Sequence, residues 1–117
     1  MTALTLSLNN LFCYFMDEEG QDEVFLKYNK KRIWPVDKKF KPFGIDTSEE
    51  LNVEIKDLKE GDKVIIELWD FDWLTPNDLL GVFELTIDEI SGPFTTDMKQ
   101  NLQETDHAKY TLEWEVY

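Results

Sequence analysis

The chain has 117 residues, of which 42% are hydrophobic and 14% aromatic, and a formal net charge of −13 at pH 7. This length fits one domain, residues 1–117, with enough apolar side chains for a core, which argues against a disordered chain. The negative charge disfavours binding to nucleic acid, and it opposes an anionic membrane unless a local patch or a bound cation intervenes.

Cysteine content and the N-terminal sequence bear on where the chain works. Cys13 is the only cysteine and lies in an apolar run, so an internal disulfide is impossible and a buried thiol is expected. No apolar stretch approaches the length of a membrane span. The first ten residues lack the basic region and the long apolar core of a signal peptide. These features favour a cytoplasmic or peripheral membrane location.

Alternation of apolar and polar residues predicts short strands along the first half of the chain. Asn9 and Asn10 mark a turn or bulge, and Pro35 ends regular pairing. An acidic loop is expected over residues 17–23, and mostly loop over residues 36–48. The expected strands are residues 4–8, 11–16, 24–28, 32–34 and 51–55.

The second half of the chain continues the strand pattern. A turn is expected at residues 88–93, and one or two helical turns at residues 96–103. The last segment alternates most cleanly, with Tyr110, Leu112, Trp114 and Val116 facing one way. Strands are expected at residues 64–70, 83–87 and 109–117. About eight short strands and no strong helix predict an all-β fold, an antiparallel β-sandwich of two sheets.

Residues 70–78 hold three aspartates, Asp70, Asp72 and Asp78, in a loop between two strongly patterned strands. Asp17 and Asp22 bracket a second acidic loop. Calcium takes six to eight oxygen ligands, which several loop carboxylates can supply, and softer metals are disfavoured because both loops lack histidine and thiolate. If both loops emerge at the same end, five aspartates converge on a calcium site. The alternative is a pair of ordinary solvated acidic loops.

A family resemblance sharpens this hypothesis. The run Leu68-Trp69-Asp70-Phe71-Asp72, followed by Asp78-Leu79-Leu80-Gly81, resembles the third calcium loop of C2 domains, especially the synaptotagmin-like kind. Residues 17–26 are similar to the first calcium loop, and residues 110–114 to the closing strand. The resemblance implies an eight-stranded, C2-like Greek-key sandwich. It also implies the calcium ligands Asp17, Asp22, Asp70, Asp72 and Asp78, with the Phe71 carbonyl as a further ligand.

The first loop departs from the family pattern. Four residues separate Asp17 and Asp22 where the family usually has five, and Glu23 replaces the usual proline. Glu23 could therefore serve as a ligand in place of Asp22.

C2 domains commonly dock on phospholipid, and Trp73 with Leu74 stands at the expected tip of the loop over residues 70–78, where tryptophan suits the membrane interface. The alternative is that Trp73 folds back over the sandwich edge. The first loop presents no apolar residue, and two calcium ions would bring the net charge only from −13 to −9. Attraction to an anionic surface would therefore act only locally, within about 8 Å.

Basic residues cluster in one part of the chain. Seven of the twelve Lys and Arg fall within fifteen residues. The cluster could bind phosphoinositide, an acidic protein or another copy of the chain, and the alternative is a solvated hairpin and loop. The turn at residues 29–31 is expected at the end opposite the acidic loops. The seven residues are Lys27, Lys30, Lys31, Arg32, Lys38, Lys39 and Lys41.

The sequence thus predicts a calcium-binding module that docks to phospholipid or to a protein partner. A second hypothesis is a protein–protein adaptor in which calcium is structural or absent. A third is a carbohydrate-binding sandwich that uses Trp34 or Trp73. No enzyme is expected, because no nucleophile motif or phosphate loop is present and His107, the single histidine, is remote in sequence from the acidic loops.

Overall fold

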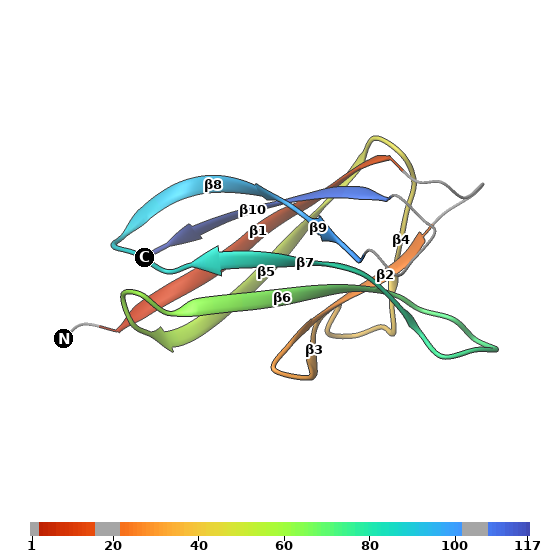
Figure 1. The fold of residues 1–117 in the computed structure, drawn as a ribbon, viewed down its shortest axis with the longest axis horizontal. Helices are drawn as coiled ribbons and strands as arrows, with labels where there is room; N and C mark the ends of the chain where they lie inside the picture. Colours follow the sequence, from red (N-terminus) through yellow and green to blue (C-terminus); the bar gives the residue numbers. More distant parts are fainter. Residues whose placement is uncertain (1–2, 16–21, 102–107) are drawn as a thin grey trace.

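A computed structural model describes residues 3–15, 22–101 and 108–117 of the chain. This part of the chain forms strands only, arranged in two antiparallel sheets (Figure 1). The predicted all-β sandwich is therefore confirmed. The strands are β1 (Leu4–Phe15), β2 (Asp22–Tyr28), β3 (Lys31–Trp34), β4 (Lys41–Phe43), β5 (Thr47–Leu58), β6 (Lys63–Asp70), β7 (Asp78–Thr86), β8 (Ser91–Asp97), β9 (Lys99–Gln100) and β10 (Lys109–Val116).

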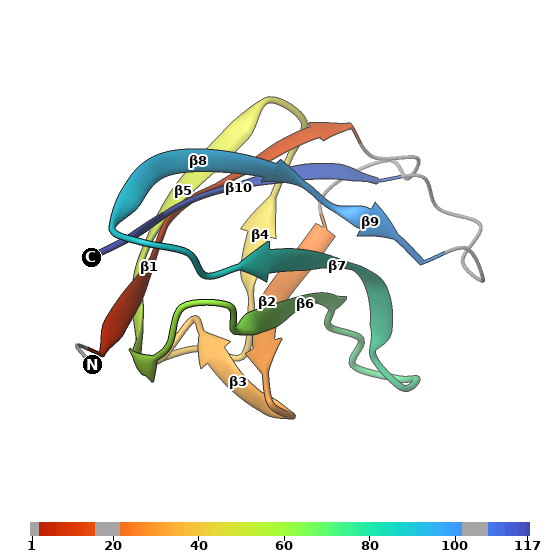
Figure 2. The same cartoon turned by 60° about the vertical axis from the view of Figure 1, so that its left-hand side comes forward.

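The two sheets have different strand orders. One sheet runs β5-β1-β10-β8, and the other runs β3-β2-β6-β7-β9, with β4 also paired to β2. β3 pairs with the second half of β2 and β4 with its first half, so both occupy the edge that faces away from β6. Figure 2 shows the two sheets as separate layers, with β8 and β9 crossing from one to the other.

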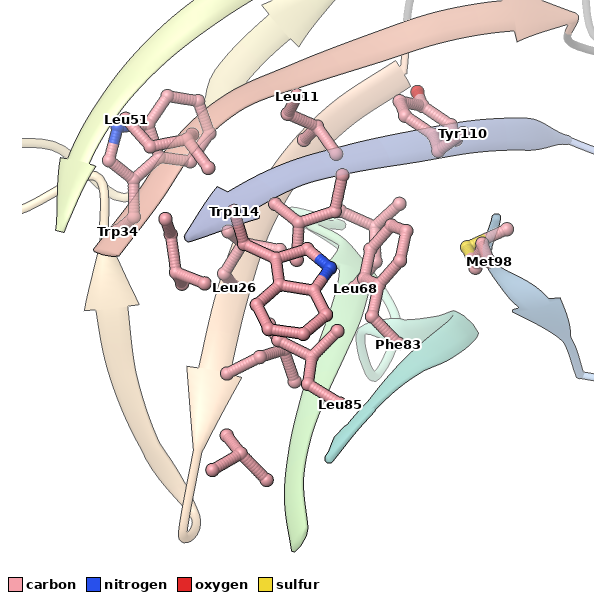
Figure 3. Packing of buried hydrophobic residues seen from close by; sticks show 14 of the residues in the cluster. Leu11, Leu26, Trp34, Leu51, Leu68, Phe83, Leu85, Met98, Tyr110 and Trp114 are labelled. Carbon is pink, nitrogen blue, oxygen red and sulfur yellow. The ribbon is translucent and has the colours of Figure 1, made fainter. Parts of the chain in front are cut away.

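The core fills the space between the sheets, because alternate side chains of each strand point inward. On β10 the buried set includes Tyr110, Leu112, Trp114 and Val116, as the alternation predicts. Leu11, Leu26, Leu68, Phe83 and Leu85 pack in the same cluster (Figure 3).

Residues 4–8 and 11–16 were expected to form two separate strands, and over the described residues 4–15 the chain forms one long strand instead. β1 runs from Leu4 to Phe15, and its pairing with both neighbours shifts register between Leu8 and Asn10. Such a shift is a β-bulge, one of the two outcomes predicted for Asn9 and Asn10.

The helical turns expected at residues 96–103 are wrong over the described residues, which end at 101. Residues 91–97 form β8, whose Thr95 and Thr96 pair with β10, and β9 follows at once. The Trp114 indole nitrogen donates a hydrogen bond to the Thr96 hydroxyl at 2.9 Å. Tertiary pairing with β10 therefore decides the local structure here, over the weak local pattern.

β6 ends and β7 begins at the end of the sandwich that lies away from both marked termini (Figure 1). β1 also ends there, and β2 begins there. This end is called the rim below. No helix in the described part of the chain is long and apolar enough to cross a membrane.

Candidate functional site

The β6–β7 connection places acidic side chains at the rim. Asp70 ends β6, Asp78 begins β7, and their Cα atoms are partners in the ladder between the two strands. Residues 71–77 span the turn beyond this pair and are mostly exposed. The hairpin thus carries Asp70, Asp72 and Asp78 together at one end of the molecule, as the sequence predicts.

Asp70 ties this hairpin to the start of β2. Its Oδ1 accepts a hydrogen bond from the Glu23 amide at 2.9 Å, and the Phe71 amide donates to the Glu23 carbonyl at 2.7 Å. The start of β2 and the β6–β7 hairpin therefore meet at the rim, through a contact between residues that are 47 positions apart in the sequence.

Asp72 organises the loop that follows. Its Oδ1 accepts hydrogen bonds from the amides of Leu74 at 2.9 Å and Thr75 at 3.3 Å, and its own amide donates to Asn77 Oδ1 at 2.9 Å. The Leu74 amide, helped by Thr75, holds the pKa of the Asp72 carboxyl below its usual range, because each donor favours the ionised form. Asp72 therefore stays charged at neutral pH.

Asp22 lies inside the sandwich rather than on its surface, with only 4% of the residue exposed. The Tyr110 hydroxyl donates to Asp22 Oδ2 at 2.6 Å. In Figure 3 that hydroxyl points away from the neighbouring labelled core side chains. The alternation of β2 holds the signal for this burial, because Asp22 shares a strand face with Val24 and Leu26.

Replacing Tyr110 by phenylalanine is expected to lower the free energy of unfolding by about 1–3 kcal/mol at neutral pH, because the buried Asp22 carboxylate loses a hydrogen-bond donor. Burial, and then the nearby Asp22 charge, raises the pKa of the Tyr110 hydroxyl well above its usual range. Below about pH 10 both folded and unfolded chains keep this proton. Above it only the unfolded chain releases the proton, so unfolding becomes easier by about 1.4 kcal/mol per pH unit.

The measurement is urea unfolding of the parent chain and the Tyr110→Phe variant from about pH 7 to pH 11, a range that spans the ordinary tyrosine pKa. The stability gap between them should shrink above about pH 10. Tyr14→Phe is the matched control, because Tyr14 is exposed. A gap that stays constant with pH, or an equal loss in the control, would contradict the assignment.

The hairpin's donor set fits calcium in kind, because Asp70, Asp72 and Asp78 offer the carboxylate oxygens that calcium takes as ligands. The Asp78 carboxylate makes no hydrogen bond within the described residues. In that same part of the chain, no three acidic, histidine or cysteine side chains lie close enough to hold a metal ion. Asp17, the first predicted ligand, and His107 lie outside the described residues.

The loop tip carries an aromatic cluster that the sequence does not reveal. Trp73 is 66% exposed and Leu74 95% exposed. Phe71 stacks on Phe40 from the β3–β4 connection, with ring centroids 5.3 Å apart, and Trp73 stands edge-on to both rings. Trp73 therefore leans on this pair but remains largely in solvent, so it does not fold back over the sandwich edge.

The basic residues divide into two groups. Lys30 lies in the turn between β2 and β3 and Lys31 begins β3, at the end of β2 opposite Asp22, as predicted. Lys39 lies at the rim instead, with its Nζ 5.2 Å from the Trp73 ring centroid. Lys41 forms an ion pair with Glu49 at 3.6 Å. The basic sequence run is therefore not one patch, because the β3–β4 connection returns to the acidic loop.

The carbohydrate-binding hypothesis loses one of its two tryptophans. Trp34 is only 7% exposed and packs its edge against Phe43 in the core. The prediction that Trp34 contacts a sugar is wrong, because a sugar-binding ring must be open to solvent. Trp73 remains exposed.

Comparison with known proteins places the fold. No protein-family model and no curated protein matches the chain. The structure of one C2 domain of a plant extended synaptotagmin 1 is similar with a TM-score of 0.57 at 13% identity, over 97% of this chain and 91% of that one. Another structure, described as that of a C2 domain, is similar with a TM-score of 0.57 at 15% identity, over 99% and 98% of the two chains. The chain therefore has the fold of a C2 domain.

Proposed function

We propose that this chain is a binding module that docks on phospholipid bilayers through its rim, in a calcium-dependent way. The observation that carries the proposal is the β6–β7 hairpin, which brings three aspartates and two exposed apolar side chains to one end of the sandwich. Carboxylates supply hard oxygen ligands, while tryptophan and leucine suit the interfacial layer of a bilayer.

Calcium at this rim would be held by Asp70, Asp72 and Asp78 with the Phe71 carbonyl, and by Asp17 and Asp22 from the first acidic loop. Bound calcium supplies positive charge that offsets the repulsion between neighbouring carboxylates and reduces the barrier to approach of a phosphate-bearing surface. Tyr110 holds Asp22 in place beneath the rim. The contacts between Glu23, Asp70 and Phe71 hold the start of β2 against the β6–β7 hairpin.

Sedimentation with phospholipid vesicles, in calcium and in chelator, tests the proposal. The parent chain should sediment in calcium and stay in solution in chelator. Leu74→Ser should weaken vesicle binding about tenfold or more, since burying one leucine is worth about 1.5–3 kcal/mol. Ile90→Ser is the matched control, because Ile90 is 69% exposed in the β7–β8 connection at the opposite end.

The control should bind vesicles as the parent chain does. Equal losses in the two variants would show that docking does not use the rim. Failure of the parent chain to sediment on any vesicle in calcium would reject the proposed function.

A protein partner is the second candidate, and the hairpin of β2 and β3 favours it. Within the described chain, Lys30, Lys31 and Arg32 form no ion pair, and all three are exposed. Such a group suits an acidic partner surface. Replacing all three by glutamine should leave vesicle binding by the rim unchanged while weakening binding to an acidic protein.

A further inference from the structure

We propose that the aromatic cluster at the rim binds the trimethylammonium group of phosphocholine, so that the bilayer it docks on is recognised through choline headgroups. The cluster consists of Phe40, Phe71 and Trp73, and it is called the aromatic corner below. This inference rests on the proposed function, since it names the lipid headgroup that the same rim takes.

The geometry of the aromatic corner suits a cation. Phe40 and Phe71 stack with an interplanar angle of 24°, and Trp73 stands at 84° to Phe71 with ring centroids 4.9 Å apart. The plane of the Trp73 ring is therefore nearly perpendicular to the planes of the stacked Phe40 and Phe71 rings, and the three rings lie close together. Ring faces carry negative charge, so a cation placed in the angle is attracted by more than one ring.

A cation already occupies the aromatic corner. The Lys39 Nζ lies 5.2 Å from the Trp73 ring centroid and 5.9 Å from that of Phe71. Lys39 reaches the corner from its own chain, is exposed, and forms no ion pair within the described residues. A quaternary ammonium is more weakly hydrated than the ammonium of lysine and is the cation that aromatic cages favour. It can therefore displace the Lys39 side chain, which is free to move into solvent.

The charges around the corner match both halves of phosphocholine. Asp72 lies in the same loop as Phe71 and Trp73, and Asp78 begins the strand that follows this loop, so the local field favours a cation even before any metal binds. Once displaced, the Lys39 ammonium stays close to the headgroup and can pair with its phosphate. A headgroup that carries only negative charge would gain the contact between its phosphate and Lys39 but not the contact with the aromatic rings. It would also be repelled by the net charge of −13 on the chain.

A peptide that contains trimethyl-lysine carries the same quaternary ammonium and is the alternative ligand. The exposure of Leu74 favours a bilayer over such a peptide. Leu74, next to Trp73, is 95% exposed and projects from the same loop tip. A peptide lying across the corner would leave that side chain in water, whereas a bilayer buries it beside the headgroup. The corner and Leu74 together therefore fit a phosphocholine surface.

The test has a solution arm and a vesicle arm. In solution, millimolar phosphocholine should shift the NMR signal of the Trp73 indole N–H in the parent chain, and this shift should be lost in Phe71→Leu, which removes one ring of the corner but keeps the Trp73 indole. In calcium, the parent chain should bind phosphatidylcholine vesicles about fivefold more tightly than phosphatidylethanolamine vesicles, the preference expected of one cation–π contact. Trp73→Leu keeps an apolar side chain but should bind the two vesicles equally.

Salt provides a further control. Tetramethylammonium chloride should inhibit phosphatidylcholine binding more than sodium chloride at the same ionic strength. Absence of a Trp73 shift with phosphocholine would overturn the proposal whether or not the chain binds vesicles. Equal binding to both vesicles, tighter binding to phosphatidylserine, or tighter binding to a trimethyl-lysine peptide than to phosphocholine would overturn it too. The proposed function would survive any of these results if vesicles still sediment only in calcium.

Discussion

Replacing Asp70 and Asp72 together by asparagine is expected to abolish the heat of calcium binding in a calorimetric titration, with a loss of affinity on the order of 100-fold or more. Asparagine keeps a carbonyl oxygen that can accept from the Glu23 amide at position 70 and from the Leu74 amide at position 72. What it removes is one negative charge and one ligand oxygen at each position. The variant should therefore stay folded while losing the calcium ion.

Two further observations make this result decisive. Calcium should raise the melting temperature of the parent chain, since a ligand that binds only the folded state stabilises it, and should not raise that of the variant. The control is Asp57→Asn with Asp88→Asn, which changes the net charge equally at exposed sites remote from the rim. Calcium binding that survives in the rim variant would mean that other residues are the ligands. An equal loss of calcium affinity in the control variant would mean that the effect comes from the change in net charge and not from the loss of ligands.

Strand positions followed from the sequence wherever inward residues alternate over several positions. β10 and β6 are the clearest cases, because apolar residues recur at every second position from Tyr110 to Val116 and from Val64 to Leu68, and all of these are buried. β8 was missed because its Gly92, Pro93 and two threonines carry no such pattern, and pairing with β10 forms the strand. The alternation of apolar and polar residues therefore predicts strands that bury one face. It cannot predict an edge strand such as β8, in which every residue is partly or fully exposed.

The candidate site also has one part that the sequence predicts and another part that it does not. Asp70, Asp72 and Asp78 lie in one hairpin, so their shared position at the rim follows from chain connectivity. Contacts between distant segments could not be predicted, and these include Tyr110 with Asp22 and Phe40 with Phe71. They depend on how the two sheets and their connections pack, which no short window of sequence specifies.

The glycine that closes the acidic hairpin has a packing reason. Gly81 pairs with Gln100 of β9, and a Cβ atom built at Gly81 would lie 2.5 Å from the Lys99 carbonyl oxygen and 2.7 Å from Met98 Cγ. The methionine can adjust, but the Lys99 carbonyl belongs to the backbone that crosses between the sheets. Close approach of β9 to β7 therefore requires glycine at this position.

Gly81→Ala is accordingly expected to lower the free energy of unfolding by about 1–3 kcal/mol, because the added methyl group must push β9 away from β7. In a chain of this size that corresponds to a fall in melting temperature of roughly 4 °C per kcal/mol. Gly44→Ala is the matched control, since the nearest atom to its added Cβ is Thr47 Cγ2 at 3.9 Å, an ordinary contact. Thermal unfolding of both variants decides the matter: an unchanged melting temperature for Gly81→Ala would show that β9 yields without cost. Since Gly81 lies in the same strand as Asp78, a displaced β9 should also weaken calcium binding at the rim, which links the packing of this edge to the proposed site.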